Sequence, residues 1–264
     1  MNDYIAPGKD ITFAINELAE LNKISKLPGK EDATPDLIEA VIEEAARLAN
    51  GVLSPHNKSG DEIGAKVVDK KVVPADGFAD IYNAFREGGW PALPFGPERG
   101  GQGLPELVAT AANEIWQAAN MSFALCPMLT EGAAVAIDAH ASEALKEIYL
   151  PKMISGEWTG TMNLTESQAG SDLAAVKTRA EPEGDHYLIS GQKIFITWGD
   201  QDFTENIVHL VLARLPDAPQ GIKGISLFIV PKYLVNDDGS LGERNDVYPV
   251  SVEHKLGIHA SPTC

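Results

Sequence analysis

Apolar residues in the first part of the chain recur with the spacing of an amphipathic helix. The segment 35–50 is the clearest case, because its apolar residues return every three or four positions and share one helix face. These residues are Leu37, Ile38, Val41, Ile42, Ala45 and Leu48. Thr34 can cap this helix, Pro35 suits its first position, and Gly51 suits its end. The pattern predicts a helix that begins at Pro35 and ends near Asn50.

Similar patterns predict further helices up to residue 154. We expect them at 11–22, 74–87, 104–120, 121–140 and 142–154. The segment 121–140 is almost entirely small or apolar, which indicates a buried helix, and Pro127 predicts an interruption in it. The segment 51–73 is expected to be a loop with a short extended piece.

From residue 158 onward the pattern is that of β-strands. Apolar and β-branched runs between turn residues predict strands at 159–165, 176–180, 186–190, 192–198, 206–213, 224–230 and 247–252. A run of helices followed by a run of strands indicates an α+β protein with two segregated domains rather than an alternating α/β fold. We therefore expect an α-helical domain over residues 1–157 and a β domain over residues 158–264.

Composition and charge narrow the range of functions. Of the 264 residues, 44% are hydrophobic, and the formal net charge is −17. Such an acidic surface repels phosphodiester backbones, so we expect no nucleic-acid partner. Cys126 and Cys264 are isolated and match no metal-ligand spacing, which favours a reducing compartment and predicts no metal site. We see no signal-peptide pattern and no apolar run of membrane-spanning length, so we expect a cytoplasmic protein with no membrane partner.

A polar loop follows the predicted strand 159–165. The run from Glu166 to Asp172 is rich in hydroxyls and contains Gly170. A strand that ends in such a loop exposes backbone N–H groups and hydroxyls together, which suits an anionic or heteroaromatic ligand, although an ordinary hairpin turn has the same composition. Glu166 is a candidate base by residue type, but its place in this loop favours a hydrogen-bonding role. His209 lies inside an apolar strand and is expected to be a buried core residue.

Four short motifs follow one another along this β region. They are Thr165-Glu166-x-x-Ala169-Gly170-Ser171-Asp172, Lys177-Thr178-x-Ala180, Gly191-x-Lys193 and Phe195-Ile196-Thr197. In this order and at these separations they resemble the flavin-binding middle domain of the acyl-CoA dehydrogenases. Segments 156–162, 207–214 and 223–231, with a short N-terminal extension around Tyr4, are similar to the subgroup that acts on 3-methylmercaptopropionyl-CoA and related short acyl-CoAs. The resemblance implies an N-terminal all-α domain followed by an antiparallel β-barrel domain.

The resemblance also implies a cofactor site in this β domain. In the family, residues at the matching positions contact FAD, and the position of Ser171 also contacts the CoA thioester arm. The implied cofactor-binding residues are Met162, Leu164, Thr165, Gly170, Ser171, Phe195, Ile196 and Thr197. Phe195 stands where the family usually has tryptophan, and Trp198 stands where it usually has asparagine. An aromatic face and nearby hydroxyls suit a flavin ring and its carbonyl and nitrogen edges.

The activity implied by the resemblance is the FAD-dependent oxidation of an acyl-CoA to the trans-2-enoyl-CoA, a reaction of fatty acid metabolism. The implied substrate is 3-methylmercaptopropionyl-CoA or another short or medium acyl-CoA. A glutamate takes the α-proton while the β-hydrogen leaves as hydride to flavin N5, and an electron-transfer flavoprotein or similar acceptor reoxidises the flavin. The last residues, up to Cys264, match the family just before the last barrel strand. The C-terminal helical-bundle domain, which carries the catalytic glutamate and most contacts of the homo-oligomer, is therefore expected to be absent from this chain. The catalytic base is accordingly unknown, and the fragment alone is expected to be inactive.

Two other functions fit the same motifs. An acyl-CoA oxidase has the same parts but lets O₂ reach the reduced flavin. A non-catalytic flavin-binding relative associated with the DNA-damage response shares the fold. Reoxidation by O₂ or by an electron-transfer partner distinguishes an oxidase from a dehydrogenase.

Overall fold

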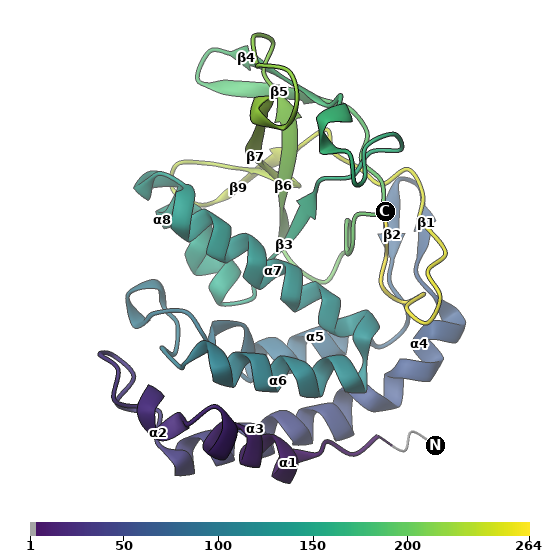
Figure 1. Cartoon of the computed structure of the whole chain (residues 1–264). Helices are drawn as coiled ribbons and strands as arrows, with labels where there is room; N and C mark the ends of the chain where they lie inside the picture. The colour runs from purple at the N-terminus through teal and green to yellow at the C-terminus, as the bar shows by residue number, and fades with distance from the viewer. Residues whose placement is uncertain (1–3) are drawn as a thin grey trace.

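The protein has a layer of helices beneath a β region (Figure 1). A computed structural model describes residues 4–264. The helices are α1 (Gly8–Phe13), α2 (Leu21–Ile24), α3 (Pro35–Leu48), α4 (Asn57–Ile63), α5 (Phe78–Glu87), α6 (Glu106–Ala119), α7 (Met121–His140) and α8 (Glu143–Ile154). The strands are β1 (Lys66–Val68), β2 (Lys71–Val73), β3 (Trp158–Asn163), β4 (Arg179–Glu183), β5 (His186–Ser190), β6 (Asn206–Arg214), β7 (Ile225–Pro231), β8 (Tyr233–Val235) and β9 (Leu241–Arg244).

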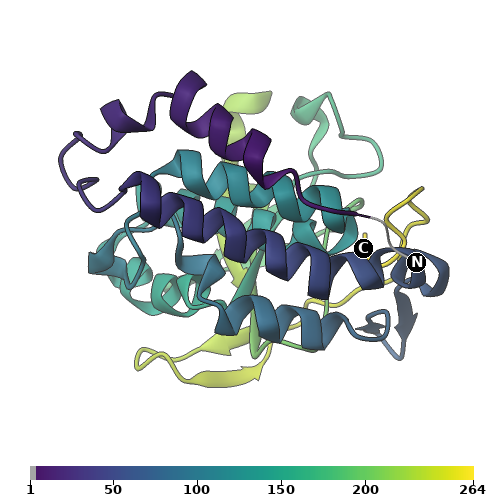
Figure 2. The same cartoon turned by 90° about the horizontal axis from the view of Figure 1, so that it is seen from below.

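Helix α3 begins at Pro35 as the sequence predicts, but helical structure continues beyond the predicted end near Asn50. Thr34 Oγ1 accepts a hydrogen bond from the Leu37 backbone N–H at 3.3 Å, which caps the helix. The chain does not leave the helix at Gly51, because a π-helical turn, Ala49–Leu53, leads on toward α4. Leu53 is fully buried in the helical core, and this burial outweighs the cost of about 1 kcal/mol for a helical glycine. The short extended piece expected within 51–73 is confirmed by the β1–β2 hairpin, but the loop expected before it is wrong, since this part of the segment contains α4. Figure 2 shows α3 crossing the lower face between the α1–α2 segment and α5.

Helix α7 is continuous through Pro127, contrary to the interruption predicted there. The helix has twenty residues, and the mean hydropathy of its most apolar window is 1.2, so it reaches the length and composition of a membrane-spanning helix, which corrects the expectation that no segment would. In the structure 44% of its most apolar window is buried. The helix packs against α6 and α8 and covers β3, so its apolar residues fill the core of the folded chain.

A glycine allows α7 to approach the sheet closely. A Cβ atom on Gly160 in β3 would lie 2.7 Å from the Cβ of Ala133 and 2.9 Å from the Cε of Met153. Thr130 Oγ1 on α7 accepts a hydrogen bond from the Gly160 backbone N–H at 3.0 Å. Only a residue without a side chain fits here, so Gly160 sets the distance between the helical layer and the first strand of the sheet.

The central sheet has the strand order β3-β6-β4-β5, with β7 also paired to β6. The α+β class is confirmed, but the sheet is mixed rather than antiparallel, because β3 and β6 are parallel from Trp158↔Asn206 to Asn163↔Val211. The chain returns to the start of β3 before β6 begins, and the Glu205 N–H donates to the Glu157 carbonyl at 3.3 Å. Both strands therefore leave the helical layer in the same direction.

Two predicted strands are absent from the described residues. The segment 192–198 forms only an isolated bridge between Thr197 and Thr263, and 247–252 has no ladder partner. Phe195 and Trp198 both have positive φ angles, 61° and 51°, which a strand does not tolerate. Conversely, the polar stretch after Val235 forms the second strand of the β8–β9 hairpin.

The hydrophobic core continues across residue 157, where we expected a domain boundary. One cluster lies among the helices and includes Trp198 from the β region. A second cluster joins α7 and α8 to the sheet through Tyr149, Leu150, Trp158 and Val208. The division into domains 1–157 and 158–264 stays a prediction, and the shared core holds the two parts in a fixed arrangement.

Candidate functional site

The end of β3 lies beside the segment that carries Phe195. The Ile194 N–H donates to the Thr165 carbonyl at 2.9 Å, and Lys193 Nζ donates to the Leu164 carbonyl at 3.0 Å. Gly170 also lies close to Thr165, since a Cβ atom on Gly170 would lie 4.0 Å from Thr165 Cγ2. The structure thus brings together the residues that the first and last motifs of the sequence had singled out.

The turn 195–198 is held in an unusual backbone conformation from both sides. Ile196 exchanges two backbone hydrogen bonds with Cys264, each 2.8 Å long. Trp198 is buried among the helices, and its Nε1–H donates to the Ser122 carbonyl at 2.8 Å. Positive φ at a residue such as Phe195 costs about 1–3 kcal/mol and persists where the surroundings enforce it, commonly at ligand sites. The structure therefore holds Phe195 and Thr197 at the surface by anchoring the residues between and after them.

The predicted cofactor residues differ in what they present to solvent. Met162 and Phe195 are 40% and 48% exposed, which is high for large apolar side chains, and Gly170 and Ser171 are also exposed. Lys255 places its ammonium 4.4 Å from the centre of the Phe195 ring. Ile196 is buried, and its backbone groups are bonded to Cys264, so its part in the site is to fix the turn.

Hydroxyl groups divide into two sets in this region. Within residues 4–264, the side-chain hydroxyls of Thr165, Ser171 and Thr197 form no hydrogen bond to another described residue. The neighbouring threonine hydroxyls are bonded inside the protein, and these belong to Thr130, Thr159, Thr161, Thr178 and Thr204. The three free hydroxyls are available to a ligand, and all three are among the predicted cofactor residues.

Glu166 stabilises the loop that contains Ser171. Its carboxylate accepts hydrogen bonds from Thr178 Oγ1 at 2.6 Å and Lys193 Nζ at 2.8 Å, and from the backbone N–H groups of Lys177 and Thr178 at 2.8 and 3.0 Å. Gln168 Nε2 donates a fifth at 2.6 Å. Burial raises the pKa of this carboxyl, but the hydrogen bonds outweigh burial and lower its pKa to about 2. Burial also lowers the pKa of Lys193, so the pair stabilises the fold by less than the Glu166 shift alone suggests.

His209 is buried, as expected from its strand. Its Nδ1 lies 2.7 Å from Thr161 Oγ1, which in turn donates to Asn163 Oδ1 at 2.6 Å. Burial lowers the pKa of His209 to about 4, so the ring is neutral at physiological pH. This chain of contacts runs along the inner side of β3, on the face opposite to Met162.

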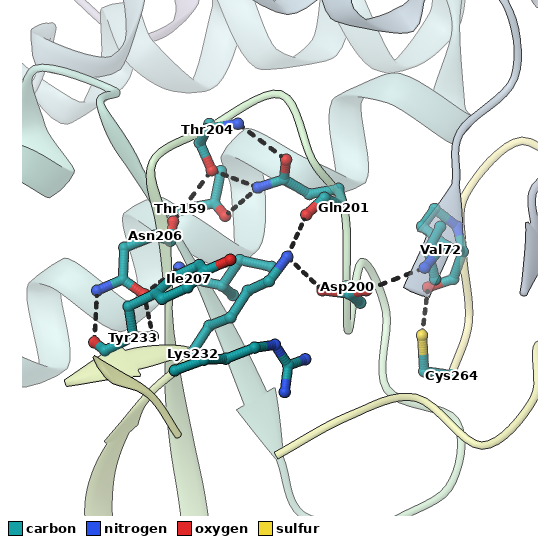
Figure 3. A network of polar contacts seen from close by, with 12 residues as sticks. Val72, Thr159, Asp200, Gln201, Thr204, Asn206, Ile207, Lys232, Tyr233 and Cys264 are labelled. Carbon is teal, nitrogen blue, oxygen red and sulfur yellow. Dashed lines mark hydrogen bonds and ion pairs between the residues drawn. The ribbon is translucent and has the colours of Figure 1, made fainter. Parts of the chain in front are cut away.

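A second buried polar network includes Asp200 and Gln201, which follow the turn 195–198 in the chain (Figure 3). Lys232 Nζ lies 2.7 Å from Asp200 Oδ1 and donates to the Gln201 carbonyl at 2.6 Å. Asp200 Oδ2 accepts from the Val72 N–H at 3.0 Å, which ties the β1–β2 hairpin to the β region. The Gln201 side chain bonds Thr159 and the loop 203–204. Sequence reasoning missed this network, because its partners are far apart in the chain and no local motif joins them.

Comparison with known proteins identifies the family. Residues 36–157 match the family model described as acyl-CoA dehydrogenase, N-terminal domain, and residues 161–264 match acyl-CoA dehydrogenase, middle domain. The chain therefore belongs to the acyl-CoA dehydrogenase family.

Individual relatives are consistent with this assignment. The chain is 48% identical to a 3-methylmercaptopropionyl-CoA dehydrogenase of Ruegeria pomeroyi, over 98% of this chain and 44% of that protein. It is 41% identical to a butyryl-CoA dehydrogenase of Syntrophomonas wolfei, over 100% of this chain and 44% of that protein. The chain thus spans under half the length of these relatives. An acyl-CoA dehydrogenase from Bacillus anthracis, solved in complex with FAD, shares the fold with a TM-score of 0.66 at 24% identity, over 88% of this chain and 35% of that one.

Proposed function

We propose that the protein is an FAD-dependent acyl-CoA dehydrogenase that oxidises a short acyl-CoA to its trans-2-enoyl-CoA. The observation that carries this proposal is the group of three unbonded hydroxyls beside the exposed side chains of Met162 and Phe195. A flavin needs an apolar or aromatic surface for its ring and donors or acceptors for its edge, and these residues supply both. When bound, FAD accepts the β-hydrogen of the substrate as hydride.

The chain's own residues bind and orient in this proposal. Phe195 contacts the face of the flavin ring, and Thr165 and Thr197 bond its polar edge. Ser171 serves the pyrophosphate or the thioester arm of the acyl-CoA. Met162, together with Leu164, Gly170 and Ile196, shapes the walls through side-chain or backbone contact.

Glu166 is not the base in this reaction. Five hydrogen bonds occupy its carboxylate, and a pKa of about 2 makes it a weak proton acceptor near neutral pH. We assign the α-proton to no residue between 4 and 264. This agrees with the sequence-based interpretation that Glu166 has a hydrogen-bonding role.

The names of the relatives support the choice of substrate, and family membership supports the electron acceptor, the oligomeric state and the location. We infer 3-methylmercaptopropionyl-CoA or butyryl-CoA as the first compounds to test, because relatives at 48% and 41% identity carry those names. We also infer an electron-transfer flavoprotein or similar acceptor, a homo-oligomeric enzyme and a cytoplasmic location. These inferences rest on family membership.

Purification of the full-length protein tests the proposal. We expect a yellow protein with one FAD per chain, released on denaturation and identified by its absorbance and fluorescence. The two acyl-CoAs should bleach the flavin, and a dye acceptor should restore it faster than O₂ does. A colourless protein that takes up no added FAD would overturn the proposal, whereas fast reoxidation by O₂ would identify an acyl-CoA oxidase.

A further inference from the structure

The loop that carries Ser171 has little regular structure of its own. Between Glu166 and the start of β4 it contains only a short 3₁₀ turn, Leu173–Ala175. Backbone groups in such a loop need partners from elsewhere, or they are free to adopt other arrangements. Glu166 supplies acceptors for the N–H groups of Lys177 and Thr178. The carbonyl groups of the same segment need a donor.

Arg214, the last residue of β6, supplies that donor. Its Nε donates to the Val176 carbonyl at 2.7 Å, and its Nη2 donates to the Ala174 carbonyl at 2.7 Å. Its backbone N–H donates to the Thr178 carbonyl at 2.9 Å. One residue thus binds three alternate carbonyls of the loop. Among residues 4–264, Arg214 has no carboxylate within ion-pair distance, so its charge is directed to these carbonyls.

A second loop holds the guanidinium from the other side. Arg214 Nη1 donates to the Gly221 carbonyl at 2.8 Å. A Cβ on Gly224 would lie 2.9 Å from Arg214 Nη1 and 1.9 Å from the Pro219 carbonyl oxygen, so only glycine fits at this position. The planar guanidinium has five N–H donors in a fixed fork, and a lysine ammonium cannot reproduce this geometry.

The contacts of Arg214 lead through Ala174 to Asp172, the residue after Ser171. Ala174, whose carbonyl Arg214 binds, donates its N–H to Asp172 Oδ1 at 3.1 Å. On the other side of Ser171, Glu166 and Ala169 exchange two backbone hydrogen bonds of 3.0 Å. Both flanks of the Ser171 turn are therefore fixed, one by Glu166 and the other through Asp172 by Arg214. The Ser171 hydroxyl itself remains free for a ligand.

We propose that Arg214 is a positioning residue that holds the loop 172–178 in place and thereby sets the affinity of the Ser171 turn for FAD. This inference rests on the proposed function, because it takes FAD as the ligand of that turn. Arg214 touches no ligand itself in this proposal. Its effect is transmitted through the carbonyls of Ala174 and Val176.

Three variants of the intact protein test the proposal. R214Q removes the charge and the fork, and R214K keeps the charge without the fork. R179Q is the matched control, because Arg179 lies opposite Arg214 in the β4–β6 pairing but is exposed and has no side-chain hydrogen bond or ion pair within the described residues. The measurements are FAD dissociation constants, hydrogen exchange of the amides in 172–178 without flavin, and thermal unfolding.

We expect R214Q to exchange faster in 172–178 than the wild type and to bind FAD about tenfold more weakly, since bonds from a charged donor are lost. R214K should recover part of the affinity, and R179Q should match the wild type in both measurements. An R214Q variant with wild-type exchange, or with wild-type FAD affinity, would overturn this inference alone. So would a loss of affinity accompanied by faster exchange throughout the protein. A wild-type protein that binds no FAD would instead overturn the proposed function.

Discussion

The buried network around Asp200 and the turn 195–198 lie next to each other but treat their polar groups in opposite ways. In the network, Asp200, Gln201 and Lys232 find partners inside the chain. In the turn, Phe195 is half exposed and the Thr197 hydroxyl has no partner among the described residues. Satisfied buried groups stabilise a fold, whereas exposed apolar rings and free hydroxyls are what a ligand needs. We therefore expect substitutions in the first region to change stability and substitutions in the second to change binding.

The largest effect should come from Asp200→Ala. This change leaves the Lys232 ammonium, whose side chain is 11% exposed, without its carboxylate and removes the acceptor of the Val72 N–H. Removing one partner of a buried pair typically costs about 3–5 kcal/mol, and we expect a loss of this size in the free energy of unfolding by urea. Asp237→Ala, at an exposed position, is the control and should cost less than about 0.5 kcal/mol. Equal effects of the two changes would show that the network does not stabilise the fold.

The buried His209 makes stability depend on pH. Burial lowers its pKa from the ordinary value of 6.5 to about 4, so the unfolded chain takes up this proton at a higher pH than the folded one. The free energy of unfolding therefore has its full value above about pH 6.5. It falls by up to about 3 kcal/mol as the pH decreases toward 4, because His209 is protonated more readily in the unfolded chain.

Unfolding by urea between pH 7 and pH 4 measures this dependence. His209→Gln should flatten the curve over that window, and His186→Gln, at an exposed histidine, should leave it unchanged. If both variants keep the wild-type slope, the acid sensitivity comes from other groups.

A smaller effect is expected where α7 meets the sheet. Gly160→Ala places a methyl group 2.7 Å from the Cβ of Ala133, and such overpacking costs about 1–3 kcal/mol. Gly132→Ala on α7 itself meets nothing within 4 Å and should stabilise the protein by about 0.5–1 kcal/mol through helix propensity. The two changes add the same methyl group, so opposite shifts in the melting temperature are the expected result. Shifts of the same sign would contradict the close approach of α7 to β3.

The sequence predicted features that depend on neighbouring residues, and it did not predict features that depend on residues far apart in the chain. Thr34 and Pro35 were sufficient to locate the start of α3, because capping is a local effect. The continuation of helical structure past Gly51 was not predictable, since burial of Leu53 by distant helices overrides the glycine. The parallel pairing of β3 and β6 arises because the chain returns at Glu205 to the start of β3. The hydrophobic pattern of the sequence does not predict this return.

The candidate site shows the same limit. The sequence motifs identified the candidate residues, including Thr165 and Ser171. Only the structure shows which of their hydroxyls have no hydrogen-bond partner among the described residues. Trp198 was noted as a departure from the family pattern, and its role as an anchor among the helices became visible only in the fold. Arg214 was part of a matching segment, yet nothing in the sequence indicated that it binds three loop carbonyls.

Two threonines test the central comparison most directly. Thr161 has its hydroxyl bonded to Asn163 and His209, and Thr197 has a free hydroxyl beside Phe195. Valine replaces each hydroxyl with a methyl group of similar size. The measurement is the FAD dissociation constant of each variant, taken together with its melting temperature.

We expect Thr197→Val to weaken FAD binding by about 1–3 kcal/mol and to leave the melting temperature of the FAD-free protein within a degree or so of the wild type. Thr161→Val should lower the melting temperature by several degrees, because two buried partners lose a hydrogen bond of roughly 1–3 kcal/mol, while FAD binding stays near the wild-type value. The same pattern in both variants, or a Thr197→Val protein that binds FAD as tightly as the wild type, would contradict the division between structural and ligand-binding hydroxyls.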